Sequence, residues 1–217
     1  MFVWFEKIFH FAEIIGTVAF AASGAMIAID RKLDLFGVLF LGITVAVGGG
    51  MTRDVLLGFT PPSAFRNPVY VAVAAVTALA VFIFAYFKRA EYKKQYHIMD
   101  RVINLLDAIG LGIFGVVGVE TAMGMGHDGN MFLCVFMGML TAVGGGILRD
   151  IFSKTIPAVL QKRIYAVASI VGCMIYYILR EINMATALAM LIGMMVTIII
   201  RLCASHYRWH LPKVDLD

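Results

Sequence analysis

The sequence predicts an all-α integral membrane protein with seven transmembrane helices. Of its 217 residues, 61% are apolar and 15% are charged, and the mean hydropathy is +0.89. Because a spanning helix needs roughly 20 apolar residues, this composition provides six or seven spans and leaves no room for a large domain outside the membrane. The net charge of +4 is better explained by topology signals beside the spans than by nucleic-acid binding. We therefore expect a protein that is not an enzyme, with no cofactor and no nucleic-acid partner.

The apolar segments fall into two groups of three, followed by a seventh. They cover residues 8–29, 35–58 and 68–87, then 102–123, 131–154 and 162–180, and finally 185–204. The chain accordingly divides into a first three-helix repeat (1–87), a basic cytoplasmic loop (88–101), a second three-helix repeat (102–180), a seventh helix (185–204) and a cytoplasmic tail (205–217).

The two groups are copies of each other in sequence. When residues 36–54 are aligned with residues 132–150, ten of nineteen positions are identical, including the shared pattern AVGGGxxRD. Further matches flank this segment and pair Gly16 with Gly110, Phe20 with Phe114, Glu13 with Asp107, and Tyr70 with Tyr165. Because each copy holds an odd number of spans, we expect the second copy to enter the membrane from the opposite side, as an inverted repeat.

Lysine and arginine residues predict the orientation in the membrane. Thirteen of them lie on the side that holds loops 30–34, 88–101 and 155–163 and the C-terminus, with Arg201 among them. Apart from Arg53 and Arg149 inside the spans, only Lys7, Arg66 and Arg180 lie on the other side. Cytoplasmic loops of membrane proteins carry an excess of these residues. We therefore expect the N-terminus outside the cell and the C-terminus in the cytoplasm.

Each copy carries three consecutive glycines inside an apolar span. The second span contains Gly48, Gly49 and Gly50, and the fifth contains Gly144, Gly145 and Gly146. Each glycine costs about 1 kcal/mol of helix propensity relative to alanine, so we predict that both helices break there. Non-helical backbone at membrane depth is tolerated where it lines a hydrated cavity, and its free carbonyls would transiently bind K⁺ or Na⁺, with no other metal site expected. The alternative is that the triplets allow close helix packing.

An Arg-Asp pair follows each triplet, as Arg53-Asp54 and Arg149-Asp150. Ionisable residues within the hydrocarbon usually face the protein interior and mark a pathway. On that hypothesis each arginine acts as a gate or anchor and each aspartate attracts cations. The alternative is an ion pair that ties the two repeats together.

Glu13 and Asp107 are the other expected intramembrane carboxylates. Each lies three residues before a matched glycine of the repeat. Either they titrate in the pathway, or they lie at the membrane interface and pair with Lys7 or Arg101.

The doubled motif GGGxxRD, at 48–54 and 144–150, resembles the trimeric intracellular cation channel family in its short prokaryotic branch. The resemblance implies a homotrimer in a bacterial inner membrane, surrounded by membrane lipids, with one potassium-permeable pore per protomer between the second and fifth spans. It also implies a trimer contact through small residues of the first and fourth spans. Animal members bind phosphoinositide through basic residues of the fourth span, and residues 107–123 contain none.

The first expectation for function is therefore a monovalent cation channel that is permeable to potassium. Prokaryotic sequences with this pattern are also labelled glycine transporters. The alternative is thus a secondary transporter of glycine or another small amino acid, in which half-helix amides hold the carboxylate and an acidic residue handles the ammonium group. A third class is a structural membrane protein without permeation.

Overall fold

The computed structural model describes residues 2–88, 96–161, 164–207 and 209, and every regular element in these ranges is a helix. Residues 89–95 of the expected basic loop (88–101) and most of the tail (205–217) lie outside these residues, whereas residues 96–101 belong to α6. The elements are α1 (Phe2–Asp30), α2 (Leu35–Leu56), α3 (Ser63–Arg66), α4 (Val69–Phe87), α6 (Tyr96–Ala122), the π-helix η1 (Met123–His127), α7 (Met131–Phe152), α8 (Ala158–Gln161), α9 (Ala166–Glu181) and α10 (Thr186–His206).

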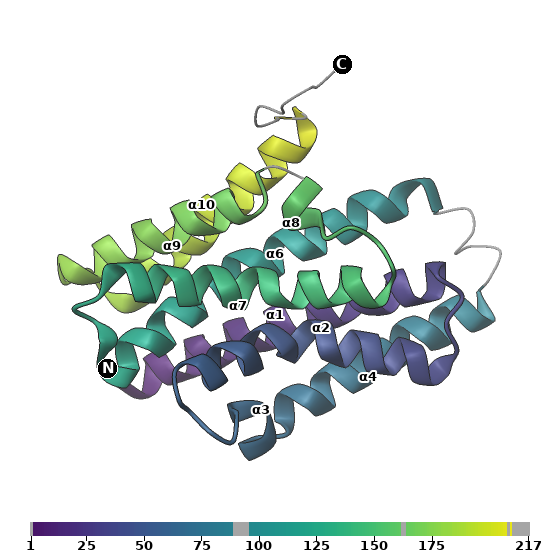
Figure 1. Ribbon diagram of the computed structural model, residues 1–217, viewed down its shortest axis with the longest axis horizontal. Coiled ribbons are helices and arrows are strands. Elements are labelled where there is room, and N and C mark those ends of the chain that lie inside the picture. The colour runs from purple at the N-terminus through teal and green to yellow at the C-terminus, as the bar shows by residue number, and fades with distance from the viewer. Residues whose placement is uncertain (1, 89–95, 162–163, 208, 210–217) are drawn as a thin grey trace.

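Four long helices form the centre of the bundle. Figure 1 shows α1, α2, α6 and α7 across the middle, with α3 and α4 on one side and α9 and α10 on the other. Helices α1, α2 and α4 contact one another, as do α6, α7 and α9. The contacts of α2 with α7 and of α1 with α6 join the two groups, while α10 packs on α6 and α9.

Six helices in the described part of the chain are long and apolar enough to cross a membrane. They are Phe9–Asp30, Leu35–Leu56, Val69–Phe87, Ile98–His127, Met131–Phe152 and Thr186–His206. The expected sixth span, over 162–180, is not confirmed as a full span, because α9 has only 16 residues. At helical rise these cover about 24 Å, less than the roughly 30 Å of the hydrocarbon core.

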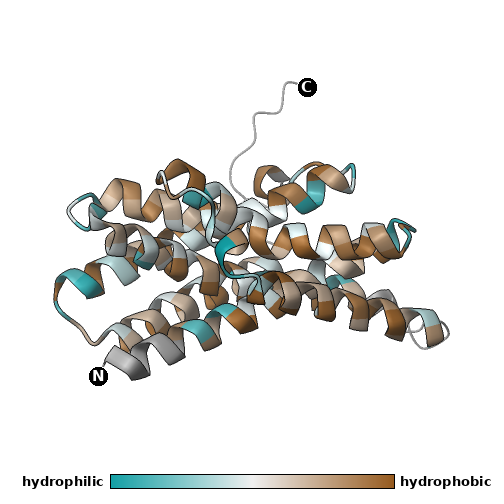
Figure 2. Cartoon of the chain, turned by 90° about the horizontal axis from the view of Figure 1, so that it is seen from below, coloured by the Kyte–Doolittle hydropathy of each residue, from teal (hydrophilic) through white to brown (hydrophobic). Residues whose placement is uncertain are grey.

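The outer faces of the helices are apolar, as an integral membrane protein requires. Phe36, Phe87 and Phe132 are each at least three-quarters exposed in the isolated chain, with exposed fractions of 75%, 77% and 79%. Figure 2 shows hydrophobic residues along most of the helix lengths, whereas many hydrophilic residues lie at helix ends and loops. Lipid or another protein chain must cover such a surface.

The two triplet-bearing helices begin with the same local structure. The side chain of Asp34 accepts a hydrogen bond from the amide of Gly37 at 2.8 Å and caps α2. Asn130 caps α7 in the same way through the amide of Leu133, at 3.0 Å. These caps satisfy amides that the first turn of a helix leaves without partners.

Both helices continue through their glycine triplets, so the predicted breaks are wrong. The triplets lie where α2 and α7 cross. A Cβ atom on Gly49 would collide with the carbonyl oxygen of Thr141, and one on Gly145 would collide with that of Val45. Because glycine has no side chain, the two backbones approach each other closely, and this packing offsets the poor helix propensity of glycine.

The small residues of the first and fourth spans also pack within the chain. A Cβ on Gly16 would lie 3.1 Å from the ring of Phe114, and one on Gly110 would collide with the ring of Phe20. Gly24 lies against α2, and Gly118 lies against Gly138 of α7. These glycines of α1 and α6 therefore serve contacts inside one protomer, and the expected trimer contact through small residues of these helices stays a prediction.

Candidate functional site

The Arg-Asp pair of the first repeat is buried at the end of α2. The Nε and Nη2 atoms of Arg53 donate to Oδ1 of Asp54 at 2.9 and 2.7 Å. The other oxygen of Asp54 accepts from the amide of Ser63 at 2.8 Å and from its hydroxyl group. Asp54 therefore holds its neighbouring arginine and fixes the start of α3.

The Arg-Asp pair of the second repeat is arranged in a similar way and makes two contacts that the first pair lacks. Nε of Arg149 donates to Oδ1 of Asp150 at 2.9 Å, and Oδ2 of Asp150 accepts from the amide of Ala158 at 2.6 Å. In addition, Nη1 of Arg149 donates to Asp107 at 2.7 Å and to the hydroxyl of Ser23 at 2.8 Å. Since Ser23 belongs to α1, this hydrogen bond links the two repeats, whereas the ion pairs of Arg149 with Asp107 and Asp150 lie within the second repeat.

The carboxylates Glu13 and Asp107 occupy different environments. Asp107 is buried and pairs with Arg149, which corrects the expectation that Arg101 would be its partner. Glu13 is only partly buried and accepts a hydrogen bond from the hydroxyl of Tyr70. Nδ1 of His10 lies 3.2 Å from the Glu13 carboxylate and 2.7 Å from the Tyr70 hydroxyl. The side chain of Lys7, the expected partner of Glu13, lies outside the described residues.

A cavity of about 70 Å³ adjoins Glu13 and Arg53. Since one water needs roughly 10–15 Å³ of such space, the cavity has room for a few waters. Its polar lining consists of Glu13, Thr17, Arg53, Ser63, Tyr70 and Thr141, and its apolar lining includes Val47, Phe114 and Val117. The Gly50 backbone completes the wall.

The position in the second repeat that corresponds to this cavity is filled by side chains. Leu111, Val143 and Tyr165 form a buried cluster there, with exposed fractions of 0%, 1% and 1%. The hydroxyl of Tyr165 points at Gly146, where an added Cβ would lie 2.6 Å from the oxygen. The matched Gly50 has only Nη2 of Arg53 near such a Cβ, at 3.8 Å. The two repeats thus hold one open and one closed version of the same arrangement.

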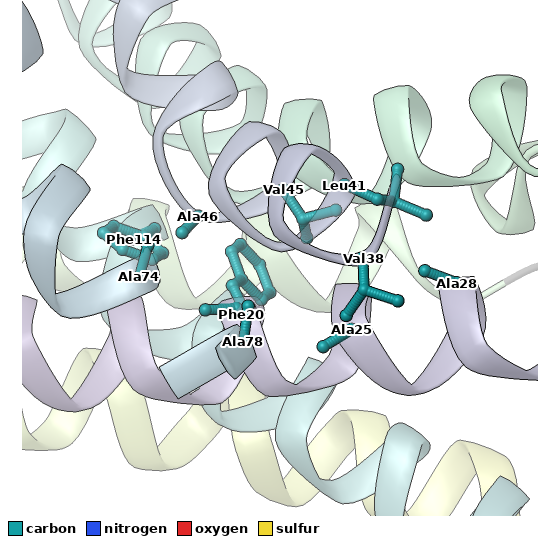
Figure 3. Close-up of a cluster of buried hydrophobic side chains, with 11 residues drawn as sticks. Phe20, Ala25, Ala28, Val38, Leu41, Val45, Ala46, Ala74, Ala78 and Phe114 are labelled. Atoms are coloured by element: carbon teal, nitrogen blue, oxygen red, sulfur yellow. The ribbon is translucent and has the colours of Figure 1, made fainter. Parts of the chain in front are cut away.

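Two phenylalanines lie between the cavity of the first repeat and the filled site of the second. The ring centroids of Phe20 and Phe114 are 5.2 Å apart, and both rings belong to the cluster in Figure 3. Phe114 lines the cavity, while Phe20 lies one helical turn before Ser23, the partner of Arg149.

Sequence reasoning found some of these residues and missed others. The repeat alignment had already matched Tyr70 with Tyr165 and Phe20 with Phe114, although no role followed from it. No sequence signal marked Ser23. Arg201 was counted among the basic residues of the cytoplasmic side, yet it is buried, with an exposed fraction of 4%.

Comparisons with known proteins identify the family. The model for the family described as "Glycine transporter" matches residues 10–86 and 104–181. A solved TRIC cation channel has 35% sequence identity and a TM-score of 0.82, over 96% of this chain and 98% of that one. The chain belongs to the TRIC cation channel family. The TRIC channel orthologue from Rhodobacter sphaeroides has 30% identity and a TM-score of 0.83, over 94% of this chain and 100% of that one.

Two bacterial relatives extend over nearly the same length as this TRIC family member. The inner membrane protein YadS of Escherichia coli K12 is 36% identical over 96% of this chain and 97% of its own length. The membrane protein YvgT of Bacillus subtilis is 32% identical over 93% of this chain and 94% of its own. Both carry the uncharacterised-family label UPF0126, which names no activity.

Proposed function

We propose that this protein is a potassium-permeable channel for monovalent cations, with one route through each protomer of a homotrimer. The observation that carries the proposal is the polar cavity beside Glu13 and Arg53, separated by a phenylalanine pair from a matched polar cluster at Asp107 and Arg149. The similarity to solved TRIC cation channels supports both the permeant ion class and the trimer.

The route follows the inner faces of α1, α2, α6 and α7. It begins at the cavity, where Glu13 and the hydroxyls of Thr17 and Thr141 attract a cation. It passes Phe20 and Phe114 and reaches the cluster around Asp107. Unbroken helices keep the carbonyls of residues 48–50 and 144–146 in backbone hydrogen bonds, so the cation contacts are assigned to side chains rather than to these carbonyls.

The charged motifs have distinct parts in this proposal. Asp54 and Asp150 anchor the segments that follow α2 and α7, since both oxygens of each carboxylate already accept hydrogen bonds. Arg53 sets the positive field at the edge of the cavity, and Arg149 closes the opposite end by pairing with Asp107. The triplets bring α2 and α7 together so that both motifs face one route.

We further propose an inverted repeat of residues 1–87 and 102–180 in a bacterial inner membrane, with α9 and α10 as sixth and seventh spans. The N-terminus is then outside and the C-terminus in the cytoplasm. The double match of one family model to residues 10–86 and 104–181 supports the repeat, and the inner membrane location of YadS supports the membrane. In this orientation the cavity faces outward and the Asp107 cluster faces the cytoplasm.

The channel proposal is tested by recording from purified protein in planar bilayers with KCl as the only salt. We expect discrete current steps whose reversal potential follows the K⁺ gradient, because ions pass without a coupled substrate. Protein with Glu13→Gln should show smaller steps. Step sizes that remain unchanged in this variant, or an absence of steps in the unmodified protein, would contradict the proposal.

A second candidate function is transport of glycine or another small amino acid. The specific observation in its favour is that the cavity is lined by both the guanidinium of Arg53 and the carboxylate of Glu13, which complement a carboxylate and an ammonium group. The family model that matches the chain is described as a glycine transporter. Saturable, proton-dependent glycine uptake by proteoliposomes, without current steps in KCl, would favour this function over the channel.

A further inference from the structure

We propose that Tyr165 and Arg201 form a latch that holds the cytoplasmic half of the route closed. This inference rests on the proposed function, since the latch regulates the same route. It assigns a role to α10, the helix without a counterpart in the repeat. Three differences between the repeats point to this latch.

The first difference concerns the tyrosine of each repeat. Tyr70 donates its hydroxyl to Glu13 at the rim of the cavity and leaves the face of Gly50 free of tyrosine atoms. The matched Tyr165 turns its hydroxyl toward Gly146 instead and fills the space that corresponds to the cavity. That hydroxyl is buried and has no hydrogen-bond partner among the described residues. The ring of Tyr165 is buried as well, with an exposed fraction of 1%.

The second difference is the arginine that covers the closed site. The guanidinium carbon of Arg201 lies 5.1 Å from the centroid of the Tyr165 ring, within the range of a cation–π contact. Arg201 is almost fully buried, and its Nε atom lacks a hydrogen-bond partner in the described structure. A buried cation without a full set of partners gains most from the ring that it faces. No residue of α10 contributes to the lining of the open cavity.

The third difference is the state of the repeat's own arginine. Arg149 pairs with Asp107, while the described partners of Arg53 include Asp54 but not Glu13. The hydroxyl of Tyr165 and Nη2 of Arg149 both face Gly146, where an added Cβ would lie 2.6 and 3.8 Å from them. The latch thus holds the tyrosine beside a closed ion pair. Release of Tyr165 from Gly146 frees the volume that the matched cavity already has.

Cysteines introduced at matched positions of the two repeats report the accessibility of each half of the route, independently of conduction. Val47 lines the open cavity and Val143 lies in the closed cluster, and they occupy the same position of the repeat. Each is replaced by cysteine in a Cys203→Ala background, since Cys134 and Cys173 are buried. In detergent micelles a small cationic methanethiosulfonate reaches both ends of the protein. We expect rapid labelling of Val47→Cys and protection of Val143→Cys.

Addition of Arg201→Gln is expected to raise the labelling rate of Val143→Cys by roughly tenfold, the shift that loss of one desolvated cation–π contact produces. Tyr165→Leu should do the same. Tyr165→Phe should leave the cysteine protected, because it keeps the ring and removes only an unpartnered hydroxyl. Arg180→Gln is the control, since Arg180 lies at the far end of α9, roughly 22 Å from Tyr165 at helical rise.

Labelling of Val47→Cys in each variant reports that the fold is retained. The latch is overturned if Val143→Cys is labelled as fast as Val47→Cys without further changes. It is also overturned if Val143→Cys stays protected in both Arg201→Gln and Tyr165→Leu. K⁺ flux into proteoliposomes then separates the two proposals. Faster labelling with increased flux supports both, whereas faster labelling with no K⁺ flux in any variant retains the latch and rejects the channel.

Discussion

Arg149 donates a hydrogen bond of 2.7 Å to Asp107, whereas the corresponding pair of the first repeat, Arg53 and Glu13, forms no ion pair in the described structure. Two copies of one sequence motif therefore occupy two different states in the same chain. In one copy the arginine closes a polar site, and in the other it lines a cavity. This difference underlies the proposals for both the route and its latch.

The glycine triplets should be sensitive to substitution at the helix crossing. Gly49→Ala places a Cβ against the carbonyl oxygen of Thr141, and backbone there cannot move aside cheaply. We expect destabilisation of about 1–3 kcal/mol, the usual cost of overpacking, measured by thermal unfolding in detergent. Gly50→Ala is the control within the same triplet, because its Cβ meets nothing closer than 3.8 Å. Equal stabilisation by both variants would instead indicate helices strained at the triplets.

The two carboxylates should differ in their contribution to stability. Asp107→Asn removes one of the two carboxylates that pair with the buried Arg149. We expect the free energy of unfolding to fall by about 3 kcal/mol. This value is near the lower end for a broken buried ion pair, because Asp150 still pairs with Arg149. Glu13→Gln can still accept the hydrogen bond from Tyr70, so its cost should stay within about 1 kcal/mol. Thermal unfolding of both variants checks this order. A larger loss for Glu13→Gln would show that the two repeats do not differ as described.

The phenylalanine pair should limit conduction. Phe114→Val replaces the ring that lines the cavity and contacts Phe20 with a smaller side chain. We therefore expect K⁺ flux into proteoliposomes to rise several-fold. Phe82→Val is a matched control, since Phe82 packs on the same hydrophobic cluster from α4 but does not line the cavity. An equal rise in both variants would point to general loosening of the bundle, and no rise in Phe114→Val would remove the pair from the route.

The orientation in the membrane can be tested with a periplasmic reporter enzyme in a bacterial host. A fusion after Asp217 should be inactive, because thirteen of the lysines and arginines outside the motifs lie on the side of the C-terminus. A fusion after Asn67, which follows α3 on the opposite side, should be active. The reverse pattern of activities would invert the proposed topology and place the cavity at the cytoplasmic face.

Sequence reasoning predicted the helical membrane fold from the apolar segment lengths and the shared GGGxxRD motif, and the TRIC family membership agrees with this fold. The functional role of the motif residues stays a prediction. The predicted helix breaks were wrong because propensity measures an isolated helix. At Gly49 and Gly145 close packing against the backbone of the partner helix offsets the low helix propensity of glycine.

The sequence by itself determined that two copies of one charged, glycine-rich motif lie inside apolar helices. Hydropathy and repetition are properties of the chain and need no contacts to be read. Only the tertiary structure decided that Arg149 meets Asp107 and Ser23, that Tyr165 fills its site while Tyr70 leaves a cavity, and that Arg201 is buried over a ring. Such differences depend on the helices packed around each copy. In particular, α10 contacts α6 and α9 of the second repeat and covers the site of that repeat but not the matched site of the first. Two copies of the same motif therefore reach different states.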